Sequence, residues 1–568
     1  MIRRCHVDRT LDAVRRSGVA DELELLLRPS RGGRPRQLRV EVFLAGLILT
    51  VQDNRALTLT NVHATLTSQI PRSAAEDLGT RYKREADGST AVITIRQVRY
   101  MLEAMERVLA HTPGRARGVD ESEWPLRAAT LQRVVDRIIA ASLPANLPVP
   151  TTMALDGTAI DSWSRFKRSF SRTDDGSAAE CGDDLVDVPT PLMDEILECR
   201  SFDRDAGLGY RTRTWDNGRS FCFGFEIFAM VGVGAVGVDP DSLPNLTYKI
   251  AVRPSGTDVV EPGLTLLDEF AADGHAVEEL LNDRAWSYKK AERWAGPLRE
   301  RGIEQVFDLH PNEHGVRDYE GIRMVDGVPH CPAMPLELAD IKRPAQLSVG
   351  ALGRHPDAIQ RAHFEKTTAE ITSFKAKIAE RKQYAFRLVA TAPSGAKDPG
   401  KLRYECPAQA GKVRCANCPM SQHLDAATTP EIDAPPALDT APACCTQRTV
   451  TIPGHVNAKL AQRHYWGDDE WIASFSRRTH VEGFFGNLKN TSGGNIKRGW
   501  CKVVGIVKTS LLIACAVAAT NIALLRTWAE RTGYTDDPLC LVDPPDFGFE
   551  ELTGEEAATP ANGPPLAA

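Results

Sequence analysis

The chain has 568 residues, enough for several domains with complete cores, and its hydrophobic content of 42% and charged content of 25% are typical of soluble globular proteins. The formal net charge of -6 excludes overall basicity as an argument for a nucleic-acid partner, so such an argument must rest on local charge.

The cysteines and the N-terminus indicate the cellular setting. The 13 cysteines are irregularly spaced, and residues 1–8 contain no apolar signal-peptide core. We therefore expect a reducing, cytoplasmic setting in which cysteines are free thiols or metal ligands. The most apolar segment, Val503–Leu525, is long enough to span a membrane, but its polar residues, such as Lys508 and Asn521, favour a buried helix and no membrane partner.

The first 118 residues have the pattern of a helical domain. Apolar residues recur at helical spacing in Leu23–Leu27, Val40–Val51 and Ile95–Leu109. Between the first two lies a basic arm rich in Gly and Pro, which includes Arg31, Arg34 and Arg36. Such an arm can follow a phosphate backbone or enter a minor groove, which favours a DNA-binding domain over 1–118; a solvated linker is an equal alternative.

Residues 143–309 alternate between strand and helix patterns, which predicts an α/β core. The expected elements are a strand in Val149–Ile160 that ends at Asp156, strands in Phe221–Val238, a helix and short strand in Thr265–Asn282, a helix in Ala285–Arg301 and a strand in Val306–Leu309.

Residues 310–470 fit this alternation poorly, and we interpret them as a large insertion. They contain a charged helix, Asp357–Lys382, a cysteine cluster, and a linker rich in Pro, Ala and Thr, Ala426–Ala443. The core then resumes over 471–531. The tail, 532–568, is rich in Pro, Gly and acidic residues and is expected to be disordered.

Three carboxylates stand where separate core elements end or begin. Asp156 and Asp283 each follow an apolar strand, and Glu482 lies on a helix near the C-terminus. Taken singly, Asp156 reads as a turn residue, Asp283 as a helix N-cap and Glu482 as a surface residue. Together they could converge on two Mg²⁺ ions, which prefer oxygen ligands and can activate a water or a 3′-hydroxyl.

The helix around Glu482 carries two cations that suit a phosphodiester. Phe475, Arg478, Glu482 and Lys489 have spacings that keep their side chains roughly on one face of a single helix. Arg478 and Lys489 could contact phosphate oxygens beside the metal ions. Lys497, Arg498 and Lys502 follow and would extend the positive surface, although an ordinary basic loop is the alternative.

On these residues the chain resembles the DDE transposases of bacterial insertion sequences. Asp156, Asp283 and Glu482 look like the family triad, and Phe475, Arg478, Glu482 and Lys489 resemble its Tyr-Arg-Glu-Lys signature, with Phe475 in place of the Tyr. The resemblance covers about Leu143 to Trp528. It implies a ribonuclease-H-like mixed sheet flanked by helices, with the insertion placed before the last catalytic helix.

The resemblance also implies an activity and partners. The three carboxylates would bind Mg²⁺ or Mn²⁺, and the enzyme would cleave double-stranded DNA at terminal inverted repeats and join it to target DNA. It would act near the nucleoid, as a homodimer on paired ends. The alternative is a catalytically inactive DNA-binding protein descended from a transposase; a metal-dependent nuclease without strand transfer is a third interpretation.

The insertion contains a candidate zinc site. Cys415 and Cys418 have the two-residue gap of a zinc knuckle, and Cys406 lies nearby. A fourth ligand could be His423, Cys444 or Cys445. The sequence leaves two alternatives, a structural Zn²⁺ that stabilises the insertion or free thiols in a solvent-facing segment.

Overall fold

The computed structural model describes residues 2–28, 36–84, 87–165, 169–172, 178–180, 201–212, 219–239, 242–345, 357–392, 400–490, 494–496 and 501–540. The chain forms two compact units. Unit 1 comprises 1–150, 156–276 and 480–568, and unit 2 comprises 151–155 and 277–479. The segment predicted to be a disordered tail lies mostly outside the described residues.

The N-terminal part of unit 1 is helical, as predicted. The helix α3 is apolar on all sides and almost entirely buried, while α6 begins with a capping box in which Thr94 and Gln97 each bond the other's backbone N–H. The elements are α1 (Arg4–Arg16), α2 (Val19–Leu26), α3 (Val40–Gln52), α4 (Leu59–Ala64), η1 (Thr65–Gln69), α5 (Arg72–Asp77), β1 (Arg81–Lys83), β2 (Thr90–Val92), α6 (Ile95–Leu109), η2 (Glu121–Glu123) and α7 (Trp124–Ala140).

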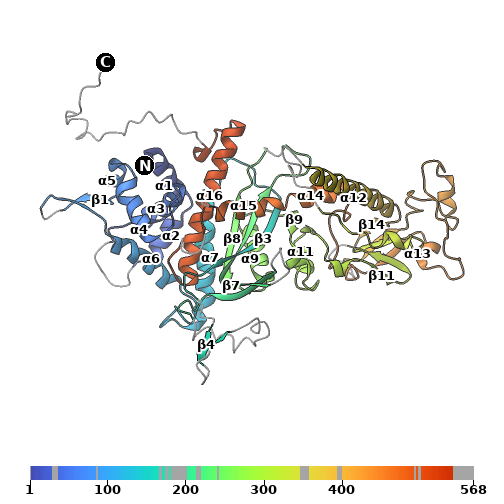
Figure 1. Cartoon of the computed structure of the whole chain (residues 1–568), viewed down its shortest axis with the longest axis horizontal. Helices are drawn as coiled ribbons and strands as arrows, with labels where there is room; N and C mark the ends of the chain where they lie inside the picture. The colour runs from blue at the N-terminus through green and yellow to red at the C-terminus, as the bar shows by residue number, and fades with distance from the viewer. Residues whose placement is uncertain are drawn as a thin grey trace, which may run out of the picture. The chain divides into compact units, whose positions relative to one another are not determined.

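The helix α16 (Ile506–Thr532) forms the centre of this helical part. Figure 1 shows it beside α3 and α7, and it packs against both. Among the described residues it is the one helix long and apolar enough to cross a membrane, but 89% of its most apolar window is buried, as in the core helix of a soluble protein. Its N-terminal N–H groups are capped from another segment of unit 1, because Asp203 accepts from Gly505 and Asp205 from Ile506, each at 2.9 Å.

A mixed six-stranded sheet has the order β10-β9-β3-β7-β6, with β8 also paired to β7. The strands β9 and β10 run parallel to β3, whereas β6 and β8 run antiparallel to β7. The strands of this sheet are β3 (Thr152–Asp161), which contributes residues to both units, β6 (Gly207–Thr212), β7 (Arg219–Val233), β8 (Thr247–Pro254), β9 (Glu279–Asn282) and β10 (Glu304–Val306). The remaining elements are β4 (Ser169–Arg172), β5 (Ala178–Glu180), α9 (Val260–Ala272), α15 (Thr479–Lys489) and η7 (Pro538–Cys540). The α/β class is therefore confirmed.

The strand β3 continues past Asp156, so the prediction that it ends there is wrong. Gly157 lacks a side chain and admits the Phe228 ring of β7, and the Ser162 N–H donates to the Phe223 carbonyl farther along. Rising numbers on β3 thus oppose falling numbers on β7, which makes the two strands antiparallel. At Gly224 the strands are so close that a Cβ would lie 2.0 Å from the carbonyl oxygen of Ile160.

Unit 2 contains the predicted insertion, which is more structured than its sequence suggests. It has two three-stranded antiparallel sheets, β11-β12-β13 and β14-β15-β16, and the charged helix α12. The bounds are β9 (Glu279–Asn282), α10 (Arg284–Ser287), α11 (Ala295–Glu300), β10 (Glu304–Val306), η4 (Pro311–Glu313), β11 (Val316–Tyr319), β12 (Ile322–Val325), β13 (Val328–His330), η5 (Leu336–Leu338), α12 (Ala358–Gln383), β14 (Arg387–Thr391), β15 (Leu402–Glu405), η6 (Pro419–His423), α13 (Ala443–Thr446), β16 (Val450–Ile452) and α14 (Asp469–Ser476).

Two expected helices are each divided. The segment Ala285–Arg301 forms the short helices α10 and α11 rather than one helix. The segment Phe475–Lys489 forms α14 and α15, separated by a turn at Arg477 and Arg478. The single helix face expected from the spacing is therefore wrong, because Phe475 and Glu482 lie on different helices.

Candidate functional site

The first two carboxylates follow paired parallel strands. The pairing of β3 with β9 runs from Thr152 opposite Glu279 to Leu155 opposite Asn282. Asp156 and Asp283 are the next residues of the two segments. Asp283 stands where β9 ends, whereas Asp156 lies within β3, which continues to Asp161.

Each aspartate also bonds locally. Asp156 is half-buried, and its Oδ1 accepts from the Gly157 N–H at 2.7 Å. Asp283 is half-buried and caps α10, where its Oδ1 accepts from the Arg284 N–H at 2.7 Å. The simpler interpretation of Asp283 as an N-cap is thus correct, but one bonded oxygen leaves a carboxylate with further acceptor capacity for a metal.

Glu482 is exposed on α15 in unit 1. The same helix is joined to β3 within this unit, because Lys489 Nζ donates to the Thr158 hydroxyl. Thr158 lies on the same face of β3 as Asp156, two residues away, and Glu482 lies two helical turns before Lys489. Beside Glu482, Gly483 and Gly486 leave open space on the helix surface.

Phe475 lies on α14, a different helix from that of Glu482. It is 9% exposed in unit 2 and stacks on Trp471 with 4.8 Å between ring centroids. The guanidinium groups of Arg343 and Arg478 lie over its ring, at 5.4 and 5.6 Å. The ring is therefore part of a packed aromatic cluster that contacts Arg478, and its DNA contact stays a prediction.

The other predicted DNA-binding residues are only partly described. Arg36 pairs with Glu24 and donates to the Leu27 carbonyl, so its guanidinium holds the end of α2. Lys502 lies over the exposed Trp163 ring, 5.4 Å from its centroid. The residues outside the described part are Arg31, Arg34, Lys497 and Arg498.

A third aspartate, which the sequence analysis missed, follows β10. The strand β10 pairs in parallel with β9, and Asp308 comes two residues after it. Its carboxylate is held at 2.6 Å by Arg284, at 3.2 Å by Arg343 and at 3.1 Å by the indole N–H of Trp466. Three donors compensate its charge, so we interpret Asp308 as an anchor for this edge of unit 2.

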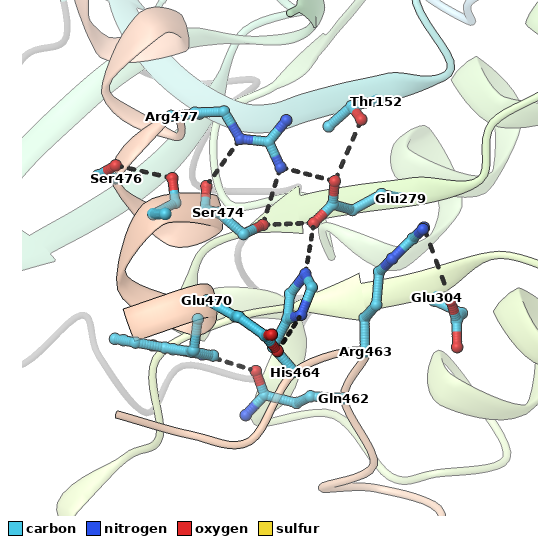
Figure 2. Close-up of polar contacts among 12 residues, drawn as sticks. Thr152, Glu279, Glu304, Gln462, Arg463, His464, Glu470, Ser474, Ser476 and Arg477 are labelled. Carbon is cyan, nitrogen blue, oxygen red and sulfur yellow. Dashed lines mark hydrogen bonds and ion pairs between the residues drawn. The ribbon is translucent and has the colours of Figure 1, made fainter. Parts of the chain in front are cut away.

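A buried glutamate, also missed, connects β9 to α14. Glu279 is 5% exposed, and Figure 2 shows its carboxylate between Arg477, Ser474, Thr152 and His464. Arg477 donates to it at 2.6 Å and Thr152 at 3.1 Å; His464 lies at 3.5 Å, and the Ser474 hydroxyl donates to the other oxygen. Burial raises the pKa of Glu279, but the hydrogen bonds from Ser474 and Arg477 outweigh burial and hold that pKa below its ordinary value.

The Glu279 network joins the first residue of β9, the strand that precedes Asp283, to the C-terminal end of α14, the helix that precedes Arg478. One carboxylate thus holds β9 and α14 together within unit 2. In the sequence, Glu279 appears as an ordinary polar residue before Leu280, so only the burial of its side chain distinguishes it.

Metal-binding potential differs between the two candidate sites. No three His, Cys, Asp or Glu side chains in the described ranges already form a group that could hold a metal ion. The carboxylates provide the oxygen donors that Mg²⁺ prefers. In unit 2, Cys406, Cys415 and Cys418 line one small cavity together with three further cysteines, whereas the predicted alternative ligand His423 is exposed outside its lining.

Comparison of the chain with models of protein families, with curated proteins and with solved structures finds no match. The functional argument therefore depends on the geometry of these residues.

Proposed function

We propose that the chain is a DDE transposase, in which Asp156, Asp283 and Glu482 bind Mg²⁺ or Mn²⁺ and catalyse cleavage and joining of DNA strands. The observation that carries the proposal is the register of β3 and β9, whose last pair immediately precedes the two aspartates. The attachment of α15 to β3 through Lys489 and Thr158 is the second support.

The proposal includes a ribonuclease-H-like core. Its support is the strand order β8-β7-β3-β9-β10, in which three antiparallel strands adjoin two parallel ones. Asp156 and Asp283 directly follow the last paired residues of β3 and β9, and Asp283 stands at the carboxyl end of its strand, where open α/β sheets bind ligands. Helix α9 packs against β7 and β8, and helix α15 is joined to β3, so both helices would flank that sheet.

The residues have distinct roles in this mechanism. Asp156, Asp283 and Glu482 would hold the metal ions, which would supply an activated water or 3′-hydroxyl and would stabilise the departing oxygen. Each aspartate accepts from a backbone N–H group at 2.7 Å, and the Glu482 side chain is exposed on α15. Arg478, supported by the Phe475 ring, and Lys489 provide cations for phosphate oxygens. The partners would be terminal inverted repeats and target DNA, bound by a homodimer.

The direct test uses the full-length protein, Mg²⁺ and DNA carrying the terminal repeats that border the gene. Wild type is expected to nick the repeat ends and produce joined products. Asp156→Asn, Asp283→Asn and Glu482→Gln should each reduce cleavage by at least about 100-fold, since the ligands act as one unit, and should leave DNA binding within about twofold. Asp161→Asn, at the end of the same strand β3, is the matched control and should retain full activity.

The outcomes separate the three interpretations. Binding without cleavage in wild type supports the inactive DNA-binding alternative, and broken ends without joined products support a nuclease. Cleavage that survives in Asp156→Asn and Asp283→Asn would refute the assignment of the metal ligands.

A further inference from the structure

Six cysteines of unit 2 line a single small cavity of about 30 Å³. Four of them are buried and two are half-buried, and they are surrounded by the apolar cluster that includes Val413 and Ile432. The six are Cys331, Cys406, Cys415, Cys418, Cys444 and Cys445. Because they line one cavity, they are neighbours in space although they come from four segments of the chain.

The local fold already holds two of these cysteines in one tight turn. The Cys418 N–H donates to the Cys415 carbonyl at 2.9 Å, and the Cys415 N–H donates to the buried Ser421 hydroxyl at 2.9 Å. Two cysteines with a two-residue gap in such a turn have the spacing that structural zinc sites use.

The fourth ligand comes from the adjacent pair Cys444 and Cys445. Their sulfurs are 4.0 Å apart, and both residues line the cavity. A tetrahedral ion that binds Cys406, Cys415 and Cys418 needs one sulfur of this pair, and the other sulfur remains beside it.

We propose that Cys406, Cys415 and Cys418, with one sulfur of the adjacent pair Cys444 and Cys445, bind one structural Zn²⁺ ion. Four thiolates complete a tetrahedral zinc shell, which fits a closed structural site without an open catalytic position. A thiol must lose its proton to bind the ion, so zinc uptake releases protons.

The consequence for the fold is local. Cys406 directly follows β15, and Cys444 and Cys445 lie in α13 shortly before β16, so the ion would close the long irregular connection between two paired strands. Closing such a connection reduces its conformational freedom. This inference does not rest on the proposed function, and a failed DNA-cleavage assay leaves it unaffected.

The test measures metal content of the full-length protein purified with a reductant and without chelator. Wild type is expected to hold about one zinc per chain and to bind Co²⁺ with sulfur-to-metal charge-transfer bands and tetrahedral d–d bands. Cys415→Ser and Cys418→Ser should weaken zinc binding by more than about 100-fold, beyond the effect of losing an outer hydrogen bond. Of Cys444→Ser and Cys445→Ser, one should weaken it equally and the other should retain zinc, and full retention in both would overturn the proposal. Cys331 lines the same cavity, and Cys331→Ser should retain stoichiometric zinc.

A measurement on wild type keeps the test decisive if a variant fails to fold. Chelation of the wild-type protein should accelerate proteolysis within Pro419–Pro442, and added Zn²⁺ should restore protection. Wild type that neither carries nor takes up zinc, cobalt spectra without thiolate bands, or the visible absorption of an iron–sulfur cluster would each overturn the proposal.

Discussion

Replacing Arg477 by Met tests how strongly the Glu279 network holds β9 to α14. The change removes a guanidinium that donates at 2.6 Å to a carboxylate, with both side chains buried, and keeps most of the packing volume. Removing one partner of a buried ion pair typically costs about 3–5 kcal/mol, because the other charge remains buried and uncompensated. Ser474 and Thr152 still donate to Glu279, which places the expected cost near the lower limit.

Protonation of Glu279 sets an upper limit to this cost. A carboxyl with an ordinary pKa of about 4.3 can be neutralised at pH 7 for roughly 3.7 kcal/mol, at about 1.36 kcal/mol per pH unit. The folded variant binds this proton more tightly than the unfolded chain, so its penalty falls as the pH is lowered. We expect a loss of about 3 kcal/mol at pH 7 and about 1 kcal/mol at pH 5.

Hydrogen exchange with mass spectrometry measures this local stability directly. Peptides covering β9 and α14 should lose protection in Arg477→Met, and the change converts to an opening free energy. The control is Arg463→Met, whose partner Glu304 is exposed at a 3.6 Å distance and should cost less than about 1 kcal/mol. In the double variant Glu279→Gln with Arg477→Met, most of the protection should return.

Two results would refute the reasoning. Equal losses of protection in Arg477→Met and Arg463→Met would show that the buried Glu279–Arg477 ion pair stabilises the structure no more than an exposed ion pair. A loss that does not shrink between pH 7 and pH 5 would show that the cost is not that of an uncompensated carboxylate.

Two further predictions concern the cores of the units. Gly224→Ala should destabilise unit 1 by more than about 2 kcal/mol in denaturant unfolding, because its Cβ would overlap the Ile160 carbonyl. Gly486→Ala on α15, where a Cβ would meet no neighbouring atom, should stabilise unit 1 by about 0.5–1 kcal/mol. Equal effects of the two substitutions would contradict the close approach of β3 and β7. In unit 2, burial and the nearby Arg381 charge lower the pKa of His330 to about 3. Unfolding exposes a histidine that binds a proton below about pH 6.5, so the free energy of unfolding should fall by about 1.4 kcal/mol per unit as pH decreases from there, and His330→Gln should remove this slope.

Much of the fold follows from patterns of apolar residues. The helices α3, α6 and α9 and the strands β7 and β9 lie where apolar spacing predicts them, because burial of one face or of a whole element determines that spacing. The end of β3 was predicted wrongly since Asp156 and Gly157 look like a turn. The strand continues because β7 comes close enough at Gly157 to require a residue without a side chain, and a neighbouring strand is not visible in local sequence.

The candidate site was predictable where chemistry shows in residue type. Asp156 and Asp283 were proposed as acids after apolar runs, and the structure adds that each directly follows the last paired residue of β3 or β9. The helix pattern from Phe475 gave no sign of the turn at Arg477, which depends on the distant acceptor Glu279. Glu279 and Asp308 were missed for the same reason: their burial and their partners arise only from tertiary contacts.

The position of α16 in the chain has a consequence for biosynthesis. The N-terminal helices α3 and α7 present apolar faces that α16 covers, yet the ribosome makes α16 hundreds of residues later. Until α16 is made, the nascent chain would expose these apolar faces, to which chaperones bind and from which aggregation begins. Premature termination before Ile506 should therefore yield insoluble product rather than a smaller folded protein.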